Sequence, residues 1–332
     1  MVSRKGRSWD QFFFLLFVND IELSLAQSKI RCFADDSRLL KFIKSSDDAL
    51  LLQKDLENVV CWAKKNNMSL NEDKFELIQH HSSVRNYSLL VNLPFVYYEN
   101  CYFTAQTTIE PSQSITDLGV IIESDLSFKL HMSDAVKRAR DKLSWGLSVF
   151  RSRSEEVICT FYKSLVRPIV EYCCALWSPM KIGDIAFIEG IQRTASSKIA
   201  SISHLNYWER LKKLRLMSLQ RRRERYVLVY MFKILHNHVP NDVNICFYDN
   251  PRLGTKAVVP PLPIYRSQIT LFDSSFTVRG PSLWNLLPKS INTVVSFQVF
   301  KEKLDNFILG FPDMPPVNGY TTSNSNSLTC WV

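Results

Sequence analysis

The stretch KIRCFADDSRLLKFI, residues 29–43, places two adjacent acids, Asp35 and Asp36, inside an otherwise apolar segment. This segment predicts two short strands with the acidic pair at the bend between them. Adjacent carboxylates repel each other and resist burial. The pair is therefore either an ordinary solvated turn or a place where a divalent cation binds.

The chemistry of such a pair suits nucleotidyl transfer. Carboxylate oxygens at a tight bend can share one or two Mg²⁺ ions, which also relieves the repulsion between Asp35 and Asp36. In two-metal catalysis, ions about 4 Å apart activate the attacking hydroxyl and neutralise the leaving group. Four letters alone do not choose between this site and a solvated Asp-Asp turn.

The composition is that of a globular protein with a basic balance. Of the 332 residues, 46% are hydrophobic and 22% are charged, and the formal charge is +9. This charge suits a polyanionic partner, either nucleic acid or an acidic membrane surface. Eight cysteines without a CxxC pair give no zinc motif and indicate the reduced thiols of an intracellular protein. We therefore expect a cytoplasmic or nuclear protein.

The apolar run FFFLLFV, residues 12–18, follows a basic N-terminus and loosely imitates a signal peptide. The run is short, and acids flank it at Asp10 and Asp20, which favours a buried helix or strand. It is also too short to cross a bilayer as a helix. We expect neither a membrane anchor nor secretion, although a cleaved leader stays an alternative.

The remaining elements predict an α+β chain. Residues 45–70 predict a capped amphipathic helix, residues 74–79 a strand, and residues 87–123 a β-rich region with a buried strand at 118–122. Beyond residue 130 the pattern becomes helical, with the apolar row Ala135, Ala139, Leu143 and Leu147. Further helices are expected at about 155–167, ending near Pro168, at 184–200 and, as one long basic helix, at 206–237.

A family resemblance extends this interpretation. In order along the chain stand FFFLLFVNDIELSL, KIRCFADDSRLLKFI, LLLQKDLENVVCWAKKNNMSLNEDKFELI, ITDLGVIIESDLSF, VICTFYKSLVRPIVEYCCALWSP and FTVRGPSLWNLLPKSI. This series resembles the reverse transcriptases of non-LTR (LINE-type) retrotransposons over about residues 12–310. The resemblance implies a truncated polymerase palm at 1–130, an α-helical thumb-like basic domain at 131–238, a Pro-rich linker at 239–270, a small module at 271–312 and a disordered tail at 313–332.

The resemblance also implies roles for particular residues. Asp35 would be the principal ligand of two Mg²⁺ or Mn²⁺ ions, and Asp36 its neighbour near the primer terminus. Lys74 would lie near the phosphates of the incoming nucleotide. The partners would be an RNA template and a DNA primer, and the nucleotide- and primer-binding positions would be Phe33, Ala34, Lys74, Leu118 and Gly119.

Basic helices supply candidate residues for contacts with the phosphate backbone of nucleic acid. Residues 210–225 carry eight basic residues, and Glu224 is the one acid among them. We predict backbone contacts from Lys137, Arg138, Lys142, Arg221, Arg222 and Arg223. A solvated helix face is the alternative. Core packing is the preferred interpretation of three tryptophans that could otherwise stack on bases, Trp145, Trp177 and Trp208.

The sequence departs from the family in one important respect. The family's palm has a further aspartate and the fingers upstream of FADD, and this chain contains neither, so a separate palm and fingers polypeptide is a possible partner. The family usually has a Pro-Gln-Gly-Ser-type segment just before LLFVND, and this chain has SRKGRSWDQFF there. Three alternatives stay open: a non-catalytic nucleic-acid-binding protein, a helical interaction protein in which FADD is chance, and a secreted protein.

Primer extension tests the expected loss of catalysis. With Mg²⁺ or Mn²⁺ on an RNA template and a DNA primer, we expect the chain alone to give no product. Losing a core metal ligand costs about 4 kcal/mol or more of transition-state stabilisation. Extension product that disappears in the Asp35→Ala variant would contradict this expectation.

Overall fold

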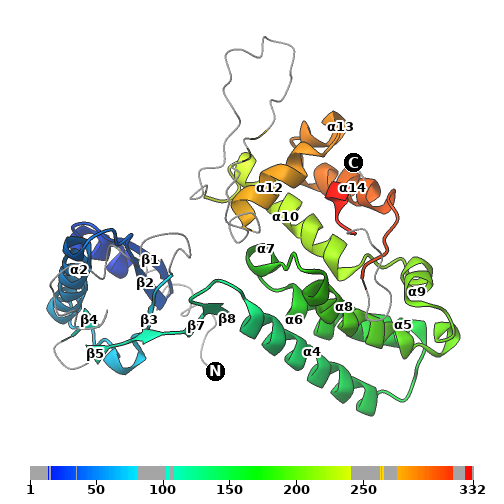
Figure 1. Cartoon of the computed structure of the whole chain (residues 1–332), viewed down its shortest axis with the longest axis horizontal. Coiled ribbons are helices and arrows are strands. Elements are labelled where there is room, and N and C mark those ends of the chain that lie inside the picture. Colours follow the sequence, from blue (N-terminus) through cyan, green and yellow to red (C-terminus); the bar gives the residue numbers. More distant parts are fainter. Residues whose placement is uncertain are drawn as a thin grey trace, which may run out of the picture. The chain divides into compact units, whose positions relative to one another are not determined.

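The computed structural model describes residues 14, 16–34, 36–80, 102–104, 108–240, 262, 264, 275–316 and 326–330. The chain forms two compact units, residues 1–115 and 116–332 (Figure 1). Helices dominate the described residues, and the strands there form small two-stranded sheets. The expected α+β class is confirmed at this level.

The first unit contains the predicted hairpin. β1 (Lys29–Phe33) pairs antiparallel with β2 (Asp36–Leu40), and the register joins Phe33 to Asp36. Ala34 follows β1 with φ 54°, the left-handed conformation that tight hairpin turns require. The two strands are therefore confirmed at the predicted place. Asp35 itself lies outside the described residues.

Helix α2 (Ser46–Lys65) is capped as its sequence predicts. The Ser45 hydroxyl accepts a hydrogen bond from the Asp48 N–H, and the Asp48 carboxylate accepts one from the Ser45 N–H. Its buried face, with Val60 and Ala63, lies toward the helical turn η1 (Asn19–Ser24). The small core of this unit is built from Val18, Ile21 and Ile30.

The other described residues of the first unit include short strands. The predicted strand at 74–79 shrinks to β3 (Leu77–Ile78), because Lys74 ends a 3₁₀ turn, η2 (Glu72–Lys74). β3 pairs in parallel with β6 (Pro111–Ser112). β4 (Tyr102–Phe103) pairs antiparallel with β5 (Thr108–Ile109). Of the predicted β-rich region, residues 87–101 and 105–107 lie outside the described residues.

The second unit begins with a hairpin that packs on a long helix. β7 (Ser114–Asp117) and β8 (Val120–Glu123) flank the turn at Leu118 and Gly119, and β8 contacts α4 (Lys129–Val149). The boundary between the two compact units falls after residue 115, inside β7. The predicted apolar row of α4 is confirmed, since Ala135, Ala139 and Leu143 are buried and Leu147 packs against them.

The predicted helix end at Pro168 is wrong. Helix α5 (Glu155–Phe161) continues through a π-helical turn, η3 (Tyr162–Val166), into α6 (Arg167–Glu171). Proline lacks an N–H and clashes with the preceding helical turn. The wider π turn comes directly before Pro168 and accommodates both effects without ending the helix. A short helix and a long one follow, α7 (Cys174–Trp177) and α8 (Ile182–Ser197).

The predicted long basic helix at 206–237 is two helices. α9 (Tyr207–Leu214) ends at Arg215, whose φ of 49° stops helical hydrogen bonding. α10 (Leu219–Leu235) starts after Ser218, whose hydroxyl accepts the Arg221 N–H. The charge pattern was continuous across the break, so it gave no signal of the break.

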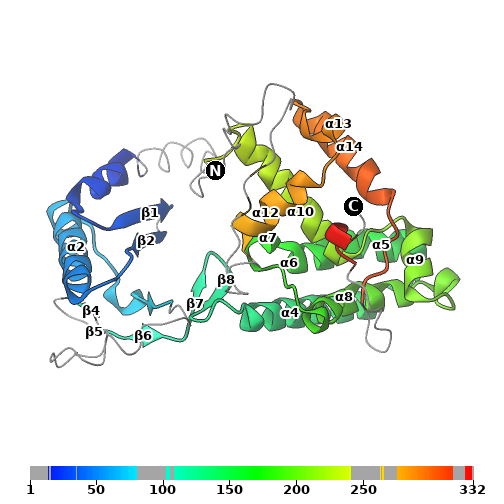
Figure 2. The ribbon, with the colours of Figure 1, turned by 45° about the horizontal axis from the view of Figure 1, so that its top comes forward.

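Helix α10 lies at the centre of the second unit (Figure 2). Its C-terminal half packs against α12 (Phe276–Asn285) and α14 (Phe297–Leu309), through Phe232, Trp284 and Phe300 among others. A four-residue helix, α13 (Lys289–Asn292), connects these two. Within the described residues, no helix is both long and apolar enough to cross a bilayer.

Part of the predicted disordered tail is packed against this unit. The turn η5 (Leu328–Cys330) buries Leu328, whose N–H donates to the Glu224 carboxylate of α10. Asp313 accepts the Ser218 N–H at the start of α10. Most of the predicted linker at 239–270 lies outside the described residues, but Leu262 exchanges two backbone hydrogen bonds with the Asn285 side chain.

A buried carboxylate fixes the first turn of α10. Glu189 of α8 accepts the Leu219 N–H at 3.0 Å and the hydroxyl of Tyr207, whose oxygen lies 3.2 Å from the Gln192 amide. Burial raises the pKa of Glu189 to about 7, although Tyr207, Arg223 and the Leu219 N–H oppose the rise. The protonated carboxyl therefore belongs to the most stable form of this core.

Replacing Glu189 by glutamine should remove a pH dependence of stability. The raised pKa means that the wild-type contribution is complete below pH 4.5 and is lost as the pH rises through about 7. Relative to Glu189→Gln, the wild type should lose up to about 3 kcal/mol between pH 4.5 and pH 8. Urea unfolding of both proteins across this range measures the difference, and a pH-independent difference would contradict the assignment.

Candidate nucleic-acid interface

The described residues of the FADD bend are exposed to solvent. Phe33 is 62% exposed, and Asp36, the first residue of β2, is also exposed. Asp55 of α2 is engaged at the other end of β1, because its two carboxylate oxygens accept the backbone N–H groups of Ala26, Gln27 and Ser28 at 2.7–3.1 Å. Asp36 therefore has the oxygen chemistry that Mg²⁺ prefers, without support from Asp55.

The described residues assemble no larger metal site. Over these parts of the chain, no three or more His, Cys, Asp or Glu side chains gather where they could hold a metal ion. Asp35 lies outside the described residues and is not included in that search. Asp36 alone would bind Mg²⁺ weakly, so the hairpin fits a metal only together with further ligands.

The other predicted site residues are divided between the two units. Phe33, Ala34 and Asp36 share the hairpin of the first unit, where Lys74 is exposed at the end of its 3₁₀ turn. Leu118 and Gly119 form the β7–β8 turn of the second unit, with φ values of 44° and 79°.

The β7–β8 turn is held from the helical side. The Tyr172 hydroxyl donates a hydrogen bond of 2.9 Å to the Leu118 carbonyl. A Cβ on Gly119 would lie 3.8 Å from the Tyr172 ring, so space alone would allow a side chain there. The left-handed φ is what favours glycine at this position.

The arginine run of α10 does not form the predicted cationic surface. Arg221 and Arg223 are each only 1% exposed, and Arg222 makes a two-pronged ion pair with Glu171, with an Nη2–Oε2 distance of 3.0 Å. Burial lowers the pKa of Arg223 below its usual value, while the hydrogen bonds to Glu171 raise that of Arg222 against the effect of burial. Arg221 and Arg223 are therefore inaccessible to a nucleic-acid backbone in this structure, and Arg222 is held by Glu171, because other helices pack around α10.

Helix α4 has the exposed cationic face that α10 lacks. Lys137, Arg138 and Lys142 are exposed, and Arg138 donates to Asp134 one turn earlier at 2.7 Å. Exposed pairs of this kind are weak, so Arg138 can exchange Asp134 for a phosphate at little cost. The three α4 residues keep the place that the sequence predicts.

An exposed tryptophan lies on the same face of α4. Trp145 is 51% exposed, and the Lys142 ammonium lies 5.2 Å from the centre of its ring. The expectation of core packing is therefore wrong for Trp145. The reason is next to it, because Gly146 lets the Phe161 ring approach the helix so closely that a Cβ would meet it at 2.0 Å. Phe161 fills the core position and leaves Trp145 at the rim.

The other two tryptophans agree with core packing. Trp177 is buried and its Nε1–H donates to the Tyr172 carbonyl at 2.8 Å. Trp208 is half-buried and donates to the Pro315 carbonyl at 3.1 Å. Trp145 could have been singled out from the sequence, because it stands one turn after the charged residues Asp141 and Lys142.

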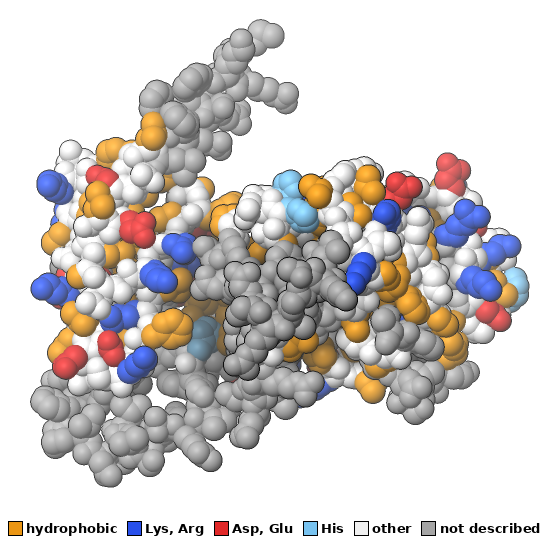
Figure 3. Space-filling model, turned by 90° about the horizontal axis from the view of Figure 1, so that it is seen from above, with side chains coloured by type: hydrophobic (Ala, Val, Ile, Leu, Met, Phe, Trp, Pro, Cys, Tyr) orange, Lys and Arg blue, Asp and Glu red, His pale blue; other side chains and the backbone are white. Residues whose placement is uncertain are grey.

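One face of the molecule carries both signs of charge. On the face drawn in Figure 3, Lys and Arg side chains stand among Asp, Glu and apolar side chains. The α4 face is a local combination of cationic and aromatic side chains. Comparisons with protein-family models, with curated proteins and with solved structures find no match for this chain.

Proposed function

We propose that this chain binds nucleic acid and derives from a non-LTR retrotransposon reverse transcriptase, with α4 lying along the backbone of an RNA–DNA primer–template. The observation that carries the proposal is the half-exposed Trp145 beside Lys142 and Arg138 on one helix face. Because Phe161 takes the core position beside Gly146, the Trp145 ring stays accessible to a ligand next to these cations.

The α4 face combines the two interactions that sequence-independent nucleic-acid binding uses. Lys137, Arg138 and Lys142 would neutralise phosphates and release counterions. The Trp145 ring offers a flat surface on which a base or sugar can stack, and it is already positioned by contact with Phe161 at 6.4 Å between ring centres. Lys142 beside the ring adds charge where the backbone would pass.

The hairpin of the first unit supports the polymerase ancestry. Its register, with Phe33 opposite Asp36, is that of a tight bend at the rim of a sheet, where Asp35 and Asp36 would hold Mg²⁺ or Mn²⁺ ions. Such ions would supply charge neutralisation to nucleotidyl transfer. Asp36 contributes an exposed carboxylate, and Lys74 would supply a cation for nucleotide phosphates.

The apolar surface of the first unit supports a protein partner. A two-stranded hairpin is marginally stable by itself and is normally completed by further strands or helices. Large apolar side chains exposed on and around this hairpin are Phe33, Leu40, Phe42 and Ile43. We propose that a palm and fingers polypeptide covers them.

Binding to a labelled RNA–DNA primer–template tests the α4 interface. We expect affinity to fall steeply with salt, and Lys142→Gln to reduce the slope of log K against log salt by about 1. Trp145→Ala should weaken binding by about tenfold, because one stacking contact is worth about 1–3 kcal/mol. Fluorescence anisotropy titrations at salt concentrations from about 50 to about 300 mM measure both effects.

Lys213→Gln is the matched control, because it removes the same charge from an exposed position on α9. It should bind almost as the wild type does. If Lys213→Gln weakens binding as much as Lys142→Gln, net charge and not the α4 face is responsible. Wild-type binding by Trp145→Ala, or no binding by the wild type, would favour the helical interaction protein instead.

A further inference from the structure

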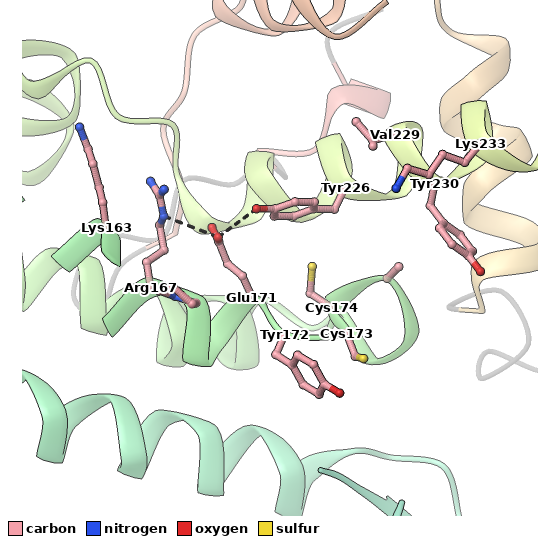
Figure 4. A pocket seen from close by; sticks show the side chains of 12 residues that line it. Lys163, Arg167, Glu171, Tyr172, Cys173, Cys174, Tyr226, Val229, Tyr230 and Lys233 are labelled. Carbon is pink, nitrogen blue, oxygen red and sulfur yellow. Dashed lines mark hydrogen bonds and ion pairs between the residues drawn. The ribbon is translucent and has the colours of Figure 1, made fainter. Parts of the chain in front are cut away.

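A hollow opens in the second unit between α10 and the helical segment formed by η3 and α6 (Figure 4). Its volume is about 480 Å³, within the range of roughly 300–1,000 Å³ typical of small-molecule sites. Two rows of side chains line it. Tyr226, Tyr230 and Lys233 come from α10, and Lys163 and Arg167 from the opposite segment.

The hollow has a surplus of positive charge. Glu171 is its one acidic lining residue, and it is already neutralised by Arg222 and approached by the Arg167 guanidinium at 3.6 Å. This leaves Lys163 at one end and Lys233 toward the other, and Figure 4 shows the Lys233 ammonium directed back toward Tyr226. An anionic ligand therefore fits this lining, whereas a cationic ligand would be repelled.

The other lining groups are aromatic and apolar. Tyr226 and Tyr230 stand one turn apart on the same side of α10. The Tyr226 hydroxyl is held at 3.3 Å from Glu171, which fixes its ring, while Tyr230 is 42% exposed and packs edge-on against Phe276. Their rings offer stacking surfaces beside the cations.

We propose that this hollow binds a nucleoside phosphate, with its base placed against the tyrosine rings, its phosphate drawn to Lys233 beside them, and Lys163 and Arg167 adding positive charge at the other end. An anion and a flat apolar group in one ligand match both parts of the lining. The ligand is either a free mononucleotide or one nucleotide of a single strand. The site uses no residue of the α4 face, so it stands or fails separately from the proposed duplex interface.

The hollow contains its own reporter. Cys173 lines it and is exposed, whereas the adjacent Cys174 is buried and has a pKa raised by burial to about 12, so it stays unreactive. A ligand in the hollow should shield Cys173 from iodoacetamide. Cys61, an exposed thiol on α2 in the other unit, provides the internal control.

The experiment measures alkylation rates of the full chain by peptide mass spectrometry with AMP, adenosine or a short oligoadenylate DNA strand. At ten times its Kd, AMP or the strand should slow labelling of Cys173 about tenfold and leave Cys61 unchanged. Protection by the strand alone identifies nucleic acid as the source of the ligand, and protection by AMP alone identifies a free nucleotide. Absence of protection by both, or equal protection by adenosine and AMP, overturns the proposal.

Variants separate the two parts of the site. Tyr230→Ala should weaken protection about tenfold, while Tyr230→Phe keeps the ring and should stay within about twofold of the wild type. Lys233→Gln should weaken binding of AMP, and Lys213→Gln, the same change outside the hollow, should not. Trp145→Ala should leave Cys173 protection by AMP unchanged even where it weakens duplex binding. Equal effects of Lys233→Gln and Lys213→Gln would contradict a local phosphate site.

Discussion

The inward direction of the α10 arginines is the constraint on which the second unit depends. Arg222 joins α10 to α6 through Glu171, and Arg225 joins it to α14 through Asp305 at 2.8 Å. Removing one partner of either pair would leave a partly buried charge without its counter-charge. Two arginines of the basic run at 221–225 therefore link α10 to α6 and to α14.

The same interior contains donors that lack acceptors. Arg223 has no hydrogen-bond partner for its guanidinium nitrogens among the described residues, although Glu189, Glu224 and Glu171 attract its charge. The Arg279 guanidinium satisfies two donors on the Ala175 and Ser178 carbonyls. This balance explains why Glu189 can lie buried at the start of α10, since nearby positive charge partly offsets its desolvation.

Because these arginines point into the protein, the exposed basic surface lies on other elements. With Arg221, Arg222 and Arg223 occupied internally, the cationic positions that solvent reaches include those of α4, beside Trp145. The hollow between α10 and α6 is a consequence of the same arrangement. Glu171 bridges the two helices there, and the rows end in Lys163 and in Lys233, whose ammonium lies 5.5 Å from the centre of the Phe297 ring.

The sequence predicted what local patterns control. The β1–β2 hairpin, the capping of α2 by Ser45 and the apolar row of α4 each follow from residues that are neighbours in the chain. The break at Arg215, the continuation through Pro168 and the exposure of Trp145 do not. They depend on partners far away in sequence, such as the contact of Gly146 with Phe161, and on hydrogen bonds that appear only when the tertiary structure is formed.

The candidate site shows the same division. The apolar, strand-like segment around FADD predicted the hairpin, and Lys137, Arg138 and Lys142 are exposed in the structure, while their contacts with a nucleic-acid backbone stay a prediction. Charge did not indicate that Arg221 and Arg223 are buried, because apart from Glu224 of α10 itself their balancing carboxylates come from other helices and from the C-terminal segment. The tyrosines and lysines of the hollow belong to two segments that no local pattern connects.

Chemical modification of arginines tests the central claim most directly. Phenylglyoxal should react quickly with Arg215 and Arg151, which are exposed, and slowly with Arg221 and Arg223 in the native chain. All four should react alike in urea, which supplies the reference rates. Modification of Arg221 and Arg223 in the native chain as fast as that of Arg215 would show that the run faces solvent and would contradict this account of the fold.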